Sequence, residues 1–198
     1  SDLDPVLPVS LEMRKEQRKF RMAMAIVLDR SGSMQAGVGR GLVKMDLANR
    51  GAAEAIKLLT SQDEVAVIPV DSAAHVLVPL TRVEDPGELT RKVLRIRSEG
   101  GGIFVYTGLI AGGKELQGSQ AATRHIVLFA DAADAEEPGD YRELLDRYRR
   151  AGITVSVIGL GTETDKDAEF LKDVAKRGGG RIFFTNRPND LPRLFAQE

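Results

Sequence analysis

Apolar segments with the character of buried strands alternate with segments of helical periodicity along most of the chain, and this alternation limits the possible folds more than any other feature. Residues 22–28 form a continuous apolar run that ends at Asp29, which is typical of a strand covered on both faces. Residues 125–130 and 153–160 form two similar runs. Residues 42–59 instead repeat apolar side chains every three or four positions, as an amphipathic helix does. The alternation predicts an α/β fold with a doubly wound, mostly parallel sheet and helices on both faces.

A hairpin interrupts the parallel pattern. Residues 64–70 and 75–80 are both β-rich, and only residues 71–74 separate them. Because a parallel crossover needs roughly a dozen residues or more, we expect these two strands to be antiparallel. With a further strand at residues 180–184, the prediction is a Rossmann-like sheet of six strands, in which 75–80 is the one antiparallel edge strand.

Capping signals and periodicity predict the other helices. Asp85, Pro86 and Glu88 form a helix start, with a capping carboxylate, a proline at the first helical position and an acid three residues after the cap. The predicted helices, apart from that at 42–59, span residues 85–96, 105–116, 140–150, 165–176 and 190–196. Residues 1–21 lack a clear period and are interpreted as an N-terminal arm, followed by a single domain over residues 22–198.

The balance of charges argues against binding to nucleic acid. The 198 residues include 28 Lys and Arg against 29 Asp and Glu, so the net charge is −1 and there is no excess of positive charge. The lack of cysteine excludes disulfides, thiolate metal sites and a cysteine nucleophile, and it leaves the compartment open. No apolar run reaches the roughly 20 residues that span a bilayer, so we expect no membrane insertion by this segment. The abrupt first and last residues suggest a piece of a longer protein.

Two of the predicted strands end in carboxylates. Asp29, Ser31 and Ser33 follow the first buried strand, and Asp131 follows a later one. In open α/β sheets ligands bind beyond the carboxyl ends of the strands, where the strand order reverses. An all-oxygen set with few carboxylates suits a hard cation, Mg²⁺ before Ca²⁺ or Mn²⁺. A turn capped by side-chain oxygens is the simpler interpretation, but it does not account for Asp131 at the same edge. The sequence therefore predicts a metal site made of these four residues.

The residues around Asp29 carry a specific resemblance. Residues 27–34, Val-Leu-Asp-Arg-Ser-Gly-Ser-Met, resemble the metal-ion-dependent adhesion motif D-x-S-x-S of von Willebrand factor type A (VWA) domains. Five further segments resemble the family. Residues 45–48 resemble its first helix, and residues 70–72 its F-S strand end. Residues 100–109 resemble its G-G-T-x-x-x-x-[AG]-L segment, residues 127–131 its T-D-G strand end and residues 155–161 its V-x-x-I-G-x-G strand. The resemblance covers residues 22–196. The sequence as a whole resembles bacterial VWA domains of larger membrane-anchored proteins. This resemblance implies the VWA fold and tethering to a membrane through segments outside this sequence.

The sequence departs from the family pattern at two positions. Ile103 stands where the family has a metal-binding Thr and offers no oxygen, and the nearest hydroxyl is that of Thr107, one turn into a predicted helix. Ala132 replaces the Gly that usually follows the second Asp, and Asp134 adds an acid nearby. The missing ligand predicts weaker Mg²⁺ binding than in a family member with Thr. Two interpretations stay open: a weakened, hydrated metal site, or a remnant that binds through polar contacts alone.

The resemblance implies a protein-binding module that is not an enzyme. In this interpretation Asp29, Ser31, Ser33 and Asp131 hold Mg²⁺, which keeps one position open for an Asp or Glu of a protein partner. The alternative is a haloacid-dehalogenase-like, Mg²⁺-dependent phosphohydrolase, which also places an Asp after its first strand. That chemistry needs a second acid two residues later, where this chain has Ser31, and no Ser–His–Asp set or phosphate-binding loop is visible.

Overall fold

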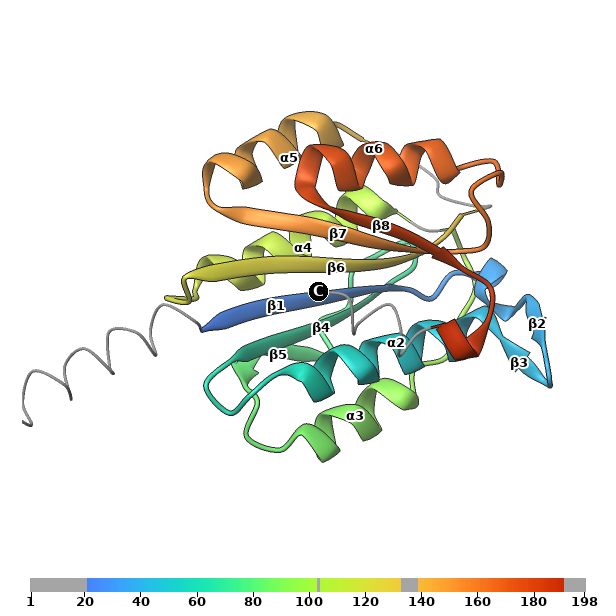
Figure 1. Cartoon of the computed structure of the whole chain (residues 1–198), viewed down its shortest axis with the longest axis horizontal. Coiled ribbons are helices and arrows are strands. Elements are labelled where there is room, and N and C mark those ends of the chain that lie inside the picture. Colours follow the sequence, from blue (N-terminus) through green and yellow to red (C-terminus); the bar gives the residue numbers. More distant parts are fainter. Residues whose placement is uncertain (1–20, 103, 133–138, 191–198) are drawn as a thin grey trace, which may run out of the picture.

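A six-stranded sheet forms the centre of the computed structural model, which describes residues 21–102, 104–132 and 139–190 (Figure 1). Its strands, in the order in which they lie across the sheet, are β5 (Val78–Arg82), β4 (Glu64–Val70), β1 (Met22–Asp29), β6 (Thr123–Asp131), β7 (Ile153–Leu160) and β8 (Gly179–Thr185). The pairs among β4, β1, β6, β7 and β8 are parallel, whereas β4 and β5 are antiparallel. The predicted doubly wound sheet with one antiparallel edge strand is confirmed.

Helices cover both faces of this sheet, as predicted. They are α2 (Lys44–Leu58), α3 (Pro86–Leu94), α4 (Val105–Gln117), α5 (Tyr141–Arg150) and α6 (Ala168–Gly178). The apolar side chains of α2 and α3 pack on one face, against residues such as Ile26, Leu28 and Phe129. Those of α4, α5 and α6 pack on the other face, against residues such as Val27 and Leu128. Burial on both sides explains why the central strands are apolar at nearly every position.

The helix starts follow the predicted capping chemistry. The carboxylate of Asp85 accepts a hydrogen bond from the backbone N–H of Glu88 at 2.9 Å, with Pro86 in the first turn of α3. Asp140 accepts from the N–H of Glu143 at 3.4 Å at the start of α5. These side chains supply partners for backbone donors that a helix leaves unpaired at its first turn.

Several boundaries differ from the sequence prediction. The edge strand begins at Val78 rather than at residue 75, because the register against β4 shifts in an irregular connection where His75 and Leu77 donate to the carbonyls of Pro69 and Val67. The helix α6 begins at Ala168 rather than at 165, because the preceding residues form a turn. The arm, apart from its last residue, and most of the helix predicted at 190–196 lie outside the described residues.

A small hairpin at the carboxyl edge of the sheet was not predicted. It consists of β2 (Gly37–Gly39) and β3 (Leu42–Val43), and it joins a short 3-10 helix, η1 (Gly32–Gln35), to α2 (Figure 1). The turn between its strands runs through positive φ angles at Gly39, Arg40 and Gly41, a conformation that favours glycine. A second 3-10 helix, η2 (Pro188–Asp190), follows β8.

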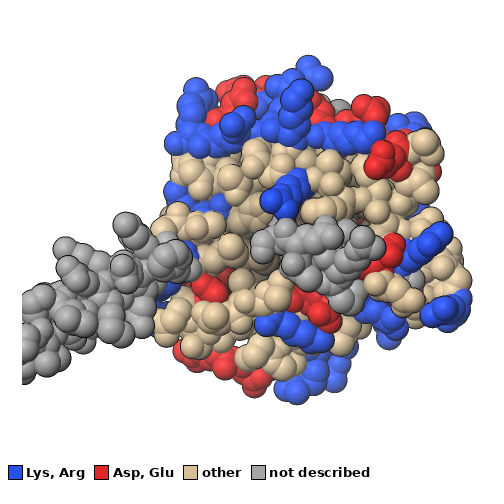
Figure 2. Space-filling model, in the orientation of Figure 1, with Lys and Arg blue, Asp and Glu red and all other residues tan. Residues whose placement is uncertain are grey.

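The described surface carries both signs of charge. Figure 2 shows Lys and Arg side chains gathered over α5 and α6, with Asp and Glu among them. Part of this surface consists of ion pairs, such as that of Asp173 with Arg177 at 2.9 Å. Within the described ranges, the helices are all too short or too polar to span a lipid bilayer.

Candidate functional site

The strand order places a switch point beside β1. From β1 the chain proceeds to β4 and β5 on one side, and it then crosses to β6, β7 and β8 on the other. Asp29 is the last residue of β1 and Asp131 the last residue of β6, and these two strands are parallel neighbours. Both carboxylates therefore lie at the carboxyl edge of the sheet, at the position where open α/β sheets bind their ligands.

Asp29 is fully buried and held by two backbone donors. Its Oδ1 accepts a hydrogen bond from the N–H of Ser31 at 2.8 Å, and its Oδ2 accepts from the N–H of Asp131 at 3.0 Å. Burial raises the pKa of Asp29 to about 6, although hydrogen bonds from Ser31 and Asp131 act in the opposite direction. The nearby Asp131 carboxylate raises this pKa further. The charged form of Asp29 is therefore costly in the isolated domain, and a cation would offset that cost.

The two serines of the motif lie together. The hydroxyl oxygens of Ser31 and Ser33 are 3.1 Å apart. The loop that carries them is fastened to the segment before α4: Ser98 Oγ donates to the Ser31 carbonyl at 2.6 Å, and the N–H of Gly32 donates to the Gly101 carbonyl at 3.0 Å. The structure thus brings the four predicted residues to one loop cluster, with the hydroxyls directed towards each other.

Lys44, which the sequence analysis did not single out, joins this cluster. Its ammonium lies 2.9 Å from Oδ1 of Asp131, and the two side chains are only 15% and 1% exposed. Lys44 is the first residue of α2, where the positive end of the helix dipole disfavours a cation. No signal in the sequence pointed to it, because the helix was predicted to begin at residue 42 and the placement at the helix start is visible only in the structure.

Charged side chains surround the loop on the β4 side. Arg30 Nε lies 2.8 Å from Oδ2 of Asp71, and its guanidinium also reaches Glu99 at 3.3 Å. The contacts of Asp71 with Arg30, Ala73 and His75 fit a role in holding the loops. Burial raises the pKa of Asp71, but hydrogen bonds from Ala73, His75 and Arg30 together hold it below its usual value. The pairing of Arg30 with Asp71 ties the loop after β1 to the loop after β4.

The residues of the family's Thr segment are only partly described. Ile103 and Asp134 lie outside the described residues. Thr107 lies in the first turn of α4. The next residue, Gly108, packs so closely on the sheet that a Cβ there would stand 2.8 Å from Val27 and 3.0 Å from Val70. The start of α4 is therefore pressed against the ends of β1 and β4, close to the motif loop.

The donor set fits a hard divalent cation. It offers two carboxylates and two hydroxyls at one sheet edge, which is the oxygen chemistry that Mg²⁺ prefers. In the described part of the chain, no group of three or more His, Cys, Asp and Glu side chains is arranged to hold a metal ion. The serine hydroxyls would therefore have to serve as ligands.

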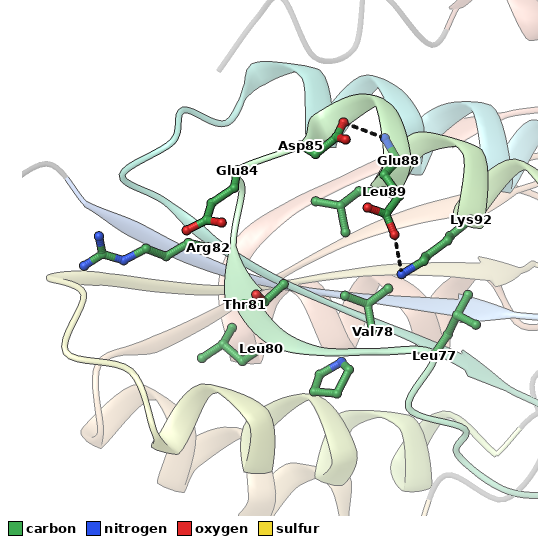
Figure 3. Close-up of a pocket in the computed structure, with 11 residues that line it drawn as sticks. Leu77, Val78, Leu80, Thr81, Arg82, Glu84, Asp85, Glu88, Leu89 and Lys92 are labelled. Atoms are coloured by element: carbon green, nitrogen blue, oxygen red, sulfur yellow. Dashed lines mark hydrogen bonds and ion pairs between the residues drawn. The ribbon is translucent and has the colours of Figure 1, made fainter.

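A separate groove of about 480 Å³ lies between β5 and α3, and none of the site residues lines it (Figure 3). Leu89 of α3 is directed towards β5, beside the ion pair of Glu88 with Lys92 at 3.0 Å. This groove follows from the packing of a helix on an edge strand, and it brings together no set of catalytic or metal-binding side chains.

The fold and the site define a Rossmann-like α/β domain with an oxygen-rich loop at its switch point. Residues 24–197 match the von Willebrand factor type A domain, and the chain belongs to this family. Domains of this family are generally protein-interaction modules of the adhesion or scaffold type and are generally not enzymes. Membership therefore favours the binding module over the phosphohydrolase.

Solved structures share the fold at low sequence identity. BatB from Bacteroides thetaiotaomicron is 19% identical, with a TM-score of 0.77 over 89% of this chain and 96% of that chain. A von Willebrand factor type A protein from Catenulispora acidiphila is 23% identical, with a TM-score of 0.75 over 89% of this chain and 41% of that chain. Proximal thread matrix protein 1 from the mussel byssus, with a zinc-occupied MIDAS motif, is 15% identical, with a TM-score of 0.74 over 91% and 45% of the two chains. A comparison with curated proteins gave no significant match.

Proposed function

We propose that the chain is a protein-binding module that recognises an acidic side chain of its partner through a Mg²⁺ ion held at the Asp29 loop. One observation supports the proposal: at the carboxyl edge of the sheet, the Asp29 carboxylate accepts hydrogen bonds from the N–H groups of Ser31 and Asp131, and the hydroxyls of Ser31 and Ser33 lie 3.1 Å apart. A zinc-occupied MIDAS motif in a mussel protein of the same fold supports a metal at this position.

Each residue has a distinct part in this proposal. Asp29 and the hydroxyls of Ser31 and Ser33 would hold the ion, and Asp131 would contact it directly or through water. Backbone N–H groups already hold the Asp29 carboxylate in position, so the site is organised before any ion arrives. When bound, the metal supplies an electron-poor centre with a position open to a carboxylate. Because Mg²⁺ keeps several of its waters in proteins, water can fill the position that Ile103 leaves without a ligand.

Calorimetric titration of Mg²⁺ and Mn²⁺ tests the metal site. We expect saturable binding at millimolar metal in the native protein and none in Asp29→Asn, which removes the central charge. Asp146→Asn, a change of the same charge at an exposed position of α5, is the matched control and should bind as the native protein does. Ile103→Thr adds the missing hydroxyl and should tighten binding. Equal affinity in the native protein and Asp29→Asn would contradict the proposal.

A further inference from the structure

The ammonium of Lys44 lies at the site, where a metal ion would compete with it for Asp131. It lies 2.9 Å from Oδ1 of Asp131, and burial of both side chains shields the pair from water. The N–H of Asp131 in turn donates to Asp29 at 3.0 Å, so that Lys44 acts on the carboxylate next to the motif loop. An ion pair with so little exposure is weakly screened by salt.

A divalent ion and this ammonium would compete for the negative charge of Asp131. The carboxylate that would coordinate the ion or its waters already carries a positive partner, and two positive charges on one carboxylate repel each other in a site of low dielectric constant. Removing either partner of a buried ion pair leaves an uncompensated charge. If one cation replaces the other, Asp131 keeps a positive partner throughout.

We propose that Lys44 is a tethered competitor of the metal ion: its ammonium neutralises Asp131 in the metal-free protein and leaves Asp131 when a divalent cation binds. The inference rests on the proposed function and deepens it, because it names the group that sets the metal concentration at which the site fills. In the metal-free protein, the ion pair of Lys44 with Asp131 stabilises the fold. The same ion pair lowers the affinity of the site for the metal ion.

The structure offers a destination for the displaced ammonium. Lys44 lines a cleft of about 430 Å³ between the β2–β3 hairpin and the loops after β7 and β8. Among the described residues that line this cleft, Asp165 is the only acid, and Arg187 is a second cation. The backbone of Lys44 is anchored by its N–H to the Ala36 carbonyl at 3.0 Å, so the side chain swings and α2 stays in place. Metal binding thereby moves one positive charge from the site into the neighbouring cleft.

Titration of Mn²⁺ into Lys44→Met tests this competition. The variant keeps much of the length of the side chain and loses its charge. We therefore expect it to bind Mn²⁺ at least about tenfold more tightly than the native protein does. Lys57→Met is the matched control: it removes the same charge from the same helix, at a surface position paired with Glu54, and should leave the affinity unchanged. Lys44→Arg keeps the competing charge and should not tighten binding.

The metal-free stability of the variants gives a second readout. Without metal, Lys44→Met should unfold at a lower denaturant concentration than the native protein, and saturating Mn²⁺ should remove that difference. If Lys44→Met does not fold without metal, Lys44→Gln replaces it, because its amide can still donate to Asp131.

The outcomes separate this inference from the proposed function. Tighter binding to Lys44→Met than to the native protein supports the competition. Equal affinities overturn the competition and leave the proposed metal site standing. Binding to Lys44→Met with none to the native protein supports the competition and overturns the proposed use of Mg²⁺ by the native chain. No binding to either protein overturns both.

Discussion

At the scale of single residues, burial shifts an aspartate and a histidine towards their neutral forms. Asp29 has a pKa of about 6 and His125 a pKa of about 4, and desolvation is the largest cause in both. The two differ in their surroundings. Asp29 stands where a cation can bind, whereas the ring of His125 has the hydroxyl of Thr154 at 2.6 Å as a neutral partner. The burial of Asp29 has a use in the proposed function, and that of His125 affects stability alone.

His125 should make the domain sensitive to acid. Its folded-state pKa of about 4 lies below the usual 6.5, so the unfolded chain binds the proton more readily, and stability falls as the pH decreases through this window. Complete titration corresponds to a loss of about 3 kcal/mol. His125→Gln, which stays neutral and can still bond to Thr154, should lose less stability than the native protein between pH 7.5 and pH 4.5.

Urea unfolding at the two pH values measures this effect. The difference between the proteins at pH 7.5 gives the packing cost of the substitution, since His125 is neutral in both states there. The further change on going to pH 4.5 isolates the titration. The same change in both proteins would show that other groups cause the acid sensitivity.

At the scale of elements, α4 depends on glycines that a helix would normally avoid. Gly108 packs against Val27 and Val70, and Gly112 packs with a Cβ position 3.2 Å from Val27 and 3.3 Å from Ile126. Each glycine costs about 1 kcal/mol of helix propensity relative to alanine. The close approach that they permit brings α4 onto the sheet beside the motif loop, which explains why the helix retains them.

Gly113→Ala should destabilise the domain by about 1–2 kcal/mol, despite the better helix propensity of alanine. A Cβ at this position would overlap the phenol of Tyr148, whose hydroxyl donates to the Leu109 carbonyl at 2.6 Å. Gly118→Ala, at the end of the same helix, meets no close neighbour and should be nearly neutral. Thermal unfolding of both variants distinguishes them. A native-like Gly113→Ala would mean that Tyr148 moves aside at little cost.

Elements that bury apolar side chains at a regular period could be predicted from the sequence. Prediction was less successful for segments whose backbone is held in place by tertiary contacts. The central strands could be predicted because both of their faces are covered. The β2–β3 hairpin could not, because its strands are too short to show a period and lie among glycines. Asp29, Ser31, Ser33 and Asp131 could be placed from the strand ends that precede them. The contact of Lys44 with Asp131 depends on how that hairpin folds, and nothing local in the sequence predicts it.

At the scale of the whole molecule, the exposed edge of the sheet at β5 is partly covered. The N–H of Leu80 donates to the Glu115 carboxylate of α4 at 2.9 Å, so a side chain occupies a backbone donor that another strand could use. Unpaired edge strands promote association between copies of a chain. Leu80 also lines the groove in Figure 3, where the exposed apolar side chain of Leu77 adds to that risk.

Glu115→Ala should therefore increase self-association, because it frees the donor of Leu80 and removes a negative charge from the edge. Glu115→Gln removes the charge but keeps an oxygen that can accept from Leu80, and we expect it to resemble the native protein more closely. Sedimentation velocity over a range of protein concentrations gives the comparison. If Glu115→Ala sediments as the native protein does at every concentration, the edge is protected by other means.

The hydrogen bond from the N–H of Asp131 to Asp29 joins residues 102 positions apart in the chain. During synthesis at about 5–20 residues per second, several seconds pass between the appearance of the motif loop and the arrival of its second carboxylate. The motif loop therefore lacks its second carboxylate while these 102 residues are made. In the proposed function, a metal-dependent partner would recognise the domain only after β6 has docked beside β1, so the position of Asp131 would delay adhesion until that strand is in place.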